Sequence, residues 1–262
     1  MIDILLLPFL TCIALVLIHV YFGTFVLKRG IVFIDLALAQ WAALGYVIGN
    51  AFHIQNHTTL FIFSFGFTVI AGFILTLLKP IFKTLNLQEA VIGVMYILAT
   101  TLALTVISST GMEGHHIKEM LSGHILFIQT SEFLEAISIY SGIGILLLFI
   151  HKKILNSNSR LWDFVFYILF GFVVTSSVKM VGVLLVFSYL VLPVLSITLI
   201  TKELKKQIIF SWIFGLSATL LGLALSISLN TPPSFCIILM LCIFWVLSII
   251  LFAIKKEKKN LI

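Results

Sequence analysis

Residues 28–49 read KRGIVFIDLALAQWAALGYVIG, a basic pair followed by an apolar run that holds a single carboxylate, Asp35. A helix that crosses the hydrocarbon layer of a bilayer needs about 20 apolar residues, and this run has that length. An ionisable side chain inside such a span costs about 2.5–3.5 kcal/mol on the insertion scale, so it marks a functional site by default. The stretch predicts a transmembrane helix with a functional acid near its first end. The alternative is that Asp35 snorkels to the interface or pairs with Lys28 or Arg29.

The composition extends this interpretation to the whole chain. Of the 262 residues, 61% are hydrophobic and 10% are charged, whereas soluble domains carry about 25% charged residues. So much apolar surface requires lipid as its solvent. We therefore expect an all-α, polytopic membrane protein of about nine transmembrane helices, in one transmembrane domain over residues 1–262. The expected spans are 4–27, 31–52, 59–78, 90–110, 132–150, 164–178, 180–200, 207–229 and 234–254. The sixth is short and joins the seventh through residues 176–179, which leaves open one span plus a re-entrant piece.

The distribution of basic residues sets the orientation. With the N-terminus outside and the spans alternating, 14 of the 16 Lys and Arg residues fall in cytoplasmic segments, and only Lys118 and Lys179 fall outside. This asymmetry follows the positive-inside rule and predicts an extracytoplasmic N-terminus and a cytoplasmic C-terminus. The basic residues are dispersed among short loops, which argues against a nucleic-acid partner. Lys179 lies at membrane depth, so it needs a carboxylate, a backbone carbonyl or outer water.

Two expected outer loops, 53–58 and 111–131, contain five of the seven histidines. His115 and Glu119 are four residues apart, so one helical face holds both if the segment is helical. With His116 and His124 they form a group suited to collecting a divalent cation. The alternative is a solvated loop whose polar residues keep it wet.

Motifs of ATP-hydrolysing and hydrolytic enzymes are absent from the sequence. There is no GxxxxGK followed by Ser or Thr, which a phosphate-binding loop requires, and no HExxH or GxSxG. We therefore predict that the chain is not an enzyme, and that any ATP-driven work depends on another subunit.

Residues 28–49 resemble the second-helix motif of the metal-ion class of ABC transporter permeases, which serve zinc, manganese and iron. Residues 89–93, 179–193 (KMVGVLLVFSYLVLP) and 230–233 resemble later motifs of that family, in the same order. The resemblance implies a homodimeric permease in the bacterial cytoplasmic membrane that moves a divalent metal ion inward by alternating access. It further implies a separate ATP-binding subunit on the cytoplasmic face, an extracytoplasmic solute-binding protein that delivers the cargo, and no cofactor in this chain.

The metal-binding pair of the family is altered here. The family carries an Asp and a His four residues apart on the second helix, and the matching positions are Leu36 and Gln40, with the acid one place earlier at Asp35. We carry over Asp35 and Gln40 as metal-site residues. Because they are five positions apart, about 500° around a helix, they do not share a face. Gln offers an oxygen where His offers the nitrogen that zinc prefers. The alternative is a permease of the same fold for a metal complex or another small solute.

The expected coupling loop, residues 151–163, is also altered. The family carries a D-x-x-x-A-x-x-x-G helix there that docks on the ATPase. Asp163 and Gly171 have the matching spacing, but Tyr167 replaces the Ala and the stretch is too apolar to lie in the cytoplasm. Coupling would then use a shortened loop with Arg160 and Trp162. The alternative is a carrier or scaffold without an ATPase.

Overall fold

The structure is a computed structural model that describes residues 2–54, 56–85, 87–110, 123, 125–156 and 159–260. These residues form nine α-helices and a short 3-10 helix, which confirms the all-α prediction. The elements are α1 (Ile2–Arg29), α2 (Ile34–Ala51), α3 (His57–Thr84), α4 (Gln88–Thr110), η1 (Ile125–Phe127), α6 (Thr130–Asn156), α7 (Arg160–Val181), α8 (Val183–Thr198), α9 (Leu204–Leu229) and α10 (Pro233–Asn260).

Each expected span corresponds to one of the nine helices, and seven of those in the described part are long and apolar enough to cross a membrane. The other two are α2 and α8. The apolar character of α2 is diluted by Asp35, Gln40 and Asn50. Helix α8 has 16 residues, about 24 Å of helix, against a hydrocarbon thickness of about 30 Å.

The boundary between the sixth and seventh helices differs from the prediction. Residues 176–179 lie inside α7, and the break comes at Gly182, whose φ is 80°. Only glycine adopts this left-handed conformation without steric cost. Helix α7 is therefore a full-length apolar helix, and the short member of the pair is α8.

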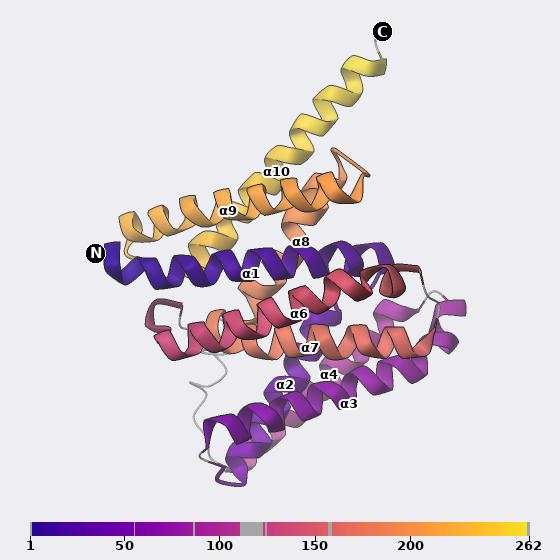
Figure 1. The fold of residues 1–262 in the computed structure, drawn as a ribbon, viewed down its shortest axis with the longest axis vertical. Coiled ribbons are helices and arrows are strands. Elements are labelled where there is room, and N and C mark those ends of the chain that lie inside the picture. Colours follow the sequence, from indigo (N-terminus) through magenta and orange to yellow (C-terminus); the bar gives the residue numbers. More distant parts are fainter. Residues whose placement is uncertain are drawn as a thin grey trace.

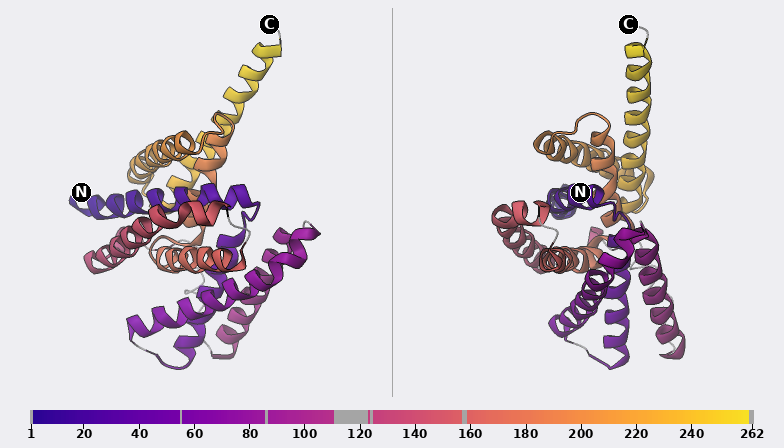
Figure 2. Two further views of the ribbon diagram at one scale, coloured as in Figure 1. Left: turned by 45° about the vertical axis from the view of Figure 1, so that its right-hand side comes forward. Right: turned by 90° about the vertical axis from the view of Figure 1, so that its right-hand side faces the viewer.

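Helices α1 and α7 are the most buried of the seven long apolar helices. In each, 67% of the apolar window is buried, compared with 22% in α6 and 11% in α10. Figure 1 shows α6 beside both α1 and α7, and both views of Figure 2 show the C-terminal half of α10 projecting away from the other helices. The rings of Phe22 and Phe170, 5.1 Å apart, join α1 to α7 in the core.

Small residues let α2 approach its neighbours closely, as the Ala-rich sequence predicts. Ala37 and Ala39 are buried. A Cβ at Gly45 would lie 2.8 Å from Cα of Ser64 in α3. Such small-residue contacts are the usual means by which helices pack in lipid, where burial of apolar side chains gives little driving force.

Candidate functional site

Asp35 lies in the first turn of α2 and is completely buried, with an exposed fraction of 0%. Neither of its carboxylate oxygens has a hydrogen-bond partner in the part of the chain that the structure describes. An ionised carboxylate buried without a partner costs several kcal/mol. The N-terminal end of a helix offsets part of that cost through its positive dipole. A cation beside the carboxylate would remove the rest.

The alternative pairing of Asp35 with Lys28 or Arg29 is not what the structure contains. Arg29 Nη1 instead donates to Oδ1 of Asp163 in α7, at 3.0 Å, and its Nη2 donates to the carbonyl of Ile154 in α6, at 2.8 Å. Asp35 is thus a buried acid without the neighbouring basic residue that its sequence position suggested.

Gln40 is also nearly buried, with an exposed fraction of 9%. Helix α2 runs without a break from Ile34 to Ala51, so Asp35 and Gln40 point in directions about 140° apart. Leu36, which is half-buried, shares a face with Gln40. Within one chain the structure does not bring Asp35 and Gln40 together as a pair of ligands. The other predicted metal residues, His115, His116, Glu119 and His124, lie outside the described residues.

Helix α4 positions the start of α2. The carboxylate of Glu89 accepts hydrogen bonds from the backbone N–H groups of Val32 and, at 3.4 Å, Phe33. About two turns further along α2, Trp41 Nε1 donates to the carbonyl of Met95, at 3.1 Å. These bonds fix the segment that carries Asp35 against α4. The family resemblance pointed to residues 89–93 but did not predict this role of Glu89.

Asp163 forms a second charged centre, which the sequence analysis missed. Its carboxylate binds Arg29 of α1 and Lys79 of α3, and the guanidinium of Arg29 lies 4.4 Å from the ring centre of Phe166. The Asp163 side chain is 4% exposed. The three charges join the ends of α1, α3 and α7. The sequence signal that could have suggested this cluster was Asp163 itself, a single acid directly after the basic segment 151–160.

The rest of the expected coupling motif also lies within the helix bundle. Gly171 packs so closely on α3 that an added Cβ would lie 2.5 Å from Cγ2 of Thr68. Tyr167 is buried. Helix α6 ends at Asn156 and α7 begins at Arg160. The stretch from Asp163 to Gly171 is therefore part of a buried helix.

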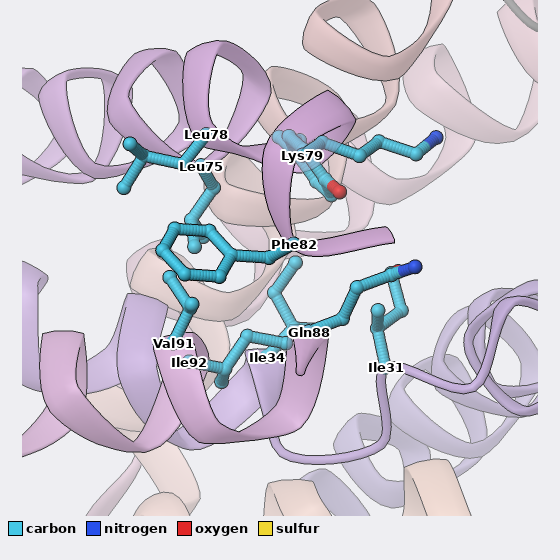
Figure 3. A pocket seen from close by; sticks show the side chains of 10 residues that line it. Ile31, Ile34, Leu75, Leu78, Lys79, Phe82, Gln88, Val91 and Ile92 are labelled. Carbon is cyan, nitrogen blue, oxygen red and sulfur yellow. The ribbon is translucent and has the colours of Figure 1, made fainter. Parts of the chain in front are cut away.

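A small pocket, open to the outside, lies next to the Asp163 cluster, between the start of α2, the end of α3 and the start of α4. Figure 3 shows the ring of Phe82 close to Val91, with the Lys79 side chain extending away from them. The lining is mainly apolar, and its polar members are Lys79, Gln88 and Tyr167. It offers no carboxylate or imidazole for a metal ion.

At the opposite ends of the helices, Lys179 of α7 has a carboxylate partner, as the sequence analysis expected of a lysine within an apolar span. Its ammonium group contacts Oε1 of Glu132 in α6, at 3.2 Å, and Nε2 of His57 in α3. In the middle of the bundle, His19 is held between its own helix and α7, with Nδ1 2.9 Å from the carbonyl of Leu15 and Nε2 3.2 Å from Oγ of Ser177.

Known proteins resemble this chain in sequence and in fold. The chain is 22% identical over 269 residues to the manganese import system permease protein ScaB of Streptococcus parasanguinis, an alignment that covers 96% of this chain and 91% of that protein. It is 21% identical over 174 residues to a probable iron transport system membrane protein of Haemophilus influenzae, covering 62% of this chain and 64% of that protein.

A solved structure, PsaBC from Streptococcus pneumoniae in complex with Fab, has the same fold, with a TM-score of 0.76 at 21% identity over 94% of this chain and 90% of that one. The model of the ABC 3 transport family matches residues 1–252, nearly the whole chain. The chain therefore belongs to the ABC 3 transport family and is a multi-pass membrane permease.

Proposed function

We propose that the chain is the permease subunit of an ABC importer that moves a divalent metal ion, manganese, iron or zinc, inward by alternating access. Family membership supports this proposal, as do relatives named for manganese and iron import. The family also makes the chain a membrane subunit and not an ATPase, as the missing phosphate-binding loop predicted.

The observation that carries the cargo assignment is the carboxylate of Asp35. It is the buried acid of α2, both of its oxygens lack hydrogen-bond partners among the described residues, and it lies one place from the acidic position of the family motif. A hard oxygen ligand of this kind suits manganese and iron(II) better than a thiolate-preferring metal. Asp35 is therefore the residue that we assign to the metal path. Gln40, which points about 140° away from it on the same helix, is the second residue that we assign.

We further propose nine membrane crossings, with the N-terminus outside and the C-terminus in the cytoplasm. Alternating crossings put the end of α1, the end of α3 and the start of α7 on one side, and contacts among Arg29, Lys79 and Asp163 join these ends. The same scheme puts the start of α3, the start of α6 and the end of α7 on the other side, where Lys179 contacts His57 and Glu132. The positive-inside rule makes the first side cytoplasmic.

In this scheme the permease works in the bacterial cytoplasmic membrane with partners on both faces. Two copies form a homodimer around the path, and an ATP-binding subunit docks on the cytoplasmic ends of the helices. A solute-binding protein delivers the ion outside, where His115, His116, Glu119 and His124 collect it.

One observation favours a second cargo, a metal complex or another small solute on the same fold. Gln40 stands where the family has His, and Leu36 stands where it has Asp, so the face that those two positions share lacks a charged ligand. A site without that pair binds a bare ion less tightly.

Metal accumulation in cells that express the chain with its ATP-binding subunit distinguishes a bare metal ion from a metal complex or another solute as the cargo. The account predicts ATPase-dependent uptake of manganese, iron or zinc that is lost in Asp35→Ala and kept in Glu203→Gln, a control that removes an exposed acid. If all three metals stay at background while the protein is folded in the membrane, the bare-ion cargo is wrong and the complexed cargo replaces it.

A further inference from the structure

The imidazole of His19 lies inside the helix bundle, and the proposed function does not use it. His19 belongs to α1 and is completely buried. Its hydrogen-bond partners are the carbonyl of Leu15 and the hydroxyl of Ser177, and no carboxylate of the described residues is bonded to it. An ionisable side chain inside a membrane span is costly, and such residues serve ion and proton pathways. His19 is therefore a candidate proton acceptor among neutral partners.

The bond to Leu15 fixes which nitrogen of His19 is free to take up a proton. A carbonyl oxygen only accepts, so Nδ1, 2.9 Å from the carbonyl of Leu15, carries the hydrogen and donates it. In the neutral imidazole the other nitrogen, Nε2, then has a free lone pair. Nε2 lies 3.2 Å from Oγ of Ser177. A further proton would bind at Nε2, and Ser177 is the group that can deliver it.

Two more hydroxyl groups continue from Ser177 towards the surface. Tyr140 of α6, the helix that lies beside both α1 and α7 (Figure 1), donates to Oγ of Ser177, at 3.2 Å. Ser176 donates to the hydroxyl of Tyr140, at 3.3 Å. Ser176 is 8% exposed, Tyr140 is 5% exposed and Ser177 is completely buried. Because these donors follow one another in one direction, the chain can pass a proton from Ser176 to His19.

The outer end of this chain reaches a small open pocket. Ser176 lines the pocket, which is formed by the start of α3, the start of α6 and the end of α7. The ionisable side chains in its lining are His57, Glu132, Glu135 and Lys179. Such groups at the end of a span lie where water reaches them, and the Lys179 side chain is 36% exposed. Water in the pocket therefore has access to Ser176, whereas His19 at the other end of the chain is sealed.

Both serines have a second acceptor, which gives each hydroxyl hydrogen two positions. The carbonyl of Val173, in the preceding turn of α7, accepts from Ser176 at 2.9 Å and also from Ser177. Rotation about the Cβ–Oγ bond moves each hydrogen from this carbonyl to the next member of the chain, and no heavy atom has to move. Adjacent residues point about 100° apart on a helix, so one serine faces α6 and the other faces α1.

The other ionisable groups around His19 do not supply a counter-charge. On the helices packed around it these groups are Cys12 and Tyr21 of α1, Lys179 of α7 and Tyr189 of α8. Tyr189 is bonded to Cys12 and Thr219, and Lys179 contacts Glu132 and His57. Helix α9 has ionisable side chains only in its first turn, and η1 has none. A proton on His19 would therefore place an unpaired charge between α1 and α7.

We propose that Ser176, Tyr140 and Ser177 form a proton relay, and that His19 is the proton-binding site that it serves. A hydronium ion in the pocket gives a proton to Ser176, whose own proton passes to Tyr140. The proton of Tyr140 passes to Ser177, and the proton of Ser177 passes to Nε2 of His19. Each hydroxyl again has one proton, the hydronium ion has become water, and the imidazole has become an imidazolium ion.

The consequence of this step is control of helix packing by protons. A buried charge without a partner costs free energy, so the imidazolium ion weakens the contact between α1 and α7. The pocket lies on the side that we assign to the outside, and this assignment rests on the proposed function. Acid on that side then shifts the permease away from the tightly packed conformation.

The test is infrared spectroscopy of the purified permease in a lipid film, with ¹⁵N-labelled histidine and a rapid change of the buffer from about pH 7 to about pH 5. The difference between the wild type and His19→Gln isolates the imidazolium band of His19, which should appear in the wild type as fast as the buffer changes. Tyr140→Phe and Ser176→Ala should slow its appearance by at least about tenfold, because the proton must wait for the bundle to open. Ser138→Ala, which removes a hydroxyl of α6 that bonds only to Leu134, should leave the rate unchanged.

A purely structural role of these hydroxyl groups predicts the opposite result. Loosened packing admits water, so protonation of His19 would then be as fast in Tyr140→Phe and Ser176→Ala as in Ser138→Ala, or faster. That result would overturn the proposal, as would the absence of an imidazolium band of His19 in the wild type. Thermal stability of the same samples identifies a variant that has lost its fold. The measurement uses neither ATP nor metal, so its outcome and that of the metal-uptake experiment are independent.

Discussion

Replacing Asp163 with asparagine removes the one carboxylate that holds Arg29 and Lys79 together. The Asp163 side chain is 4% exposed, and those of Arg29 and Lys79 are 17% and 21% exposed. Removing one partner of a buried ion pair costs about 3–5 kcal/mol, because the remaining charge stays buried. Both cations here reach water in part, so we expect the low end, about 3 kcal/mol of unfolding free energy.

The assay is denaturant-induced unfolding of the purified protein in mild detergent, with Lys79→Met and the double variant beside Asp163→Asn. Lys79→Met leaves the Arg29–Asp163 bond in place and should cost about 1 kcal/mol. Because the two residues are in contact, the double variant should lose about 1–2 kcal/mol less than the sum of the single variants. Glu203→Gln, which breaks an exposed pair with Lys206, should have no measurable effect. If Asp163→Asn is as stable as Glu203→Gln, Asp163 does not clamp the helix ends.

Three further substitutions test the packing that positions α2 and α1. Gly23→Ala should destabilise the protein by about 3 kcal/mol or more, because the new Cβ would lie 2.0 Å from a backbone carbonyl oxygen of α8. Gly66→Ala is the control in the same unfolding assay. It should leave the stability unchanged, because a Cβ at Gly66 would meet nothing within 4 Å. Glu89→Ala should cost about 1–2 kcal/mol and expose the start of α2 to faster hydrogen exchange, since two backbone N–H groups lose their acceptor. Trp41→Phe should cost about 1 kcal/mol through the lost bond to Met95, and an unchanged stability would show that this bond contributes nothing.

The helices were predictable from the sequence because lipid imposes a length and a composition on each span. All nine expected segments coincide with helices, and the errors lie at the ends. Helix α3 continues to Thr84, where the prediction ended at 78, and α6 continues to Asn156, where it ended at 150. Apolar runs report the part of a helix that lies in hydrocarbon, and helices extend beyond it into the interface.

The break between α7 and α8 was misplaced for a different reason. The serines of residues 176–179 looked like a connection, but they lie in α7, where hydroxyl groups bond to the preceding turn and to neighbouring helices. The actual break depends on a single positive φ at Gly182, and glycines are common inside transmembrane helices. Sequence alone does not distinguish a glycine that ends a helix from a glycine inside a helix.

The sequence singled out Asp35 as an acid inside an apolar run, and the structure buries it completely, but its surroundings were not predictable. The nearest basic residues in the sequence, Lys28 and Arg29, suggested a local pair. Arg29 instead reaches Asp163, 134 positions away. Such long-range ion pairs depend on how helix ends meet, which neither periodicity nor charge counting specifies.

The central claim is that Asp35 lies on the path of a divalent metal ion that ATP hydrolysis drives inward. Its most direct test is uptake of radioactive manganese, iron or zinc into proteoliposomes that contain the permease and its ATP-binding subunit, for the wild type and Asp35→Asn. The account predicts ATP-dependent accumulation of one of these metals by the wild type. It predicts a rate lower by about tenfold or more in Asp35→Asn, the loss expected for one charge-assisted ligand. Uptake by Asp35→Asn at the wild-type rate would contradict the account.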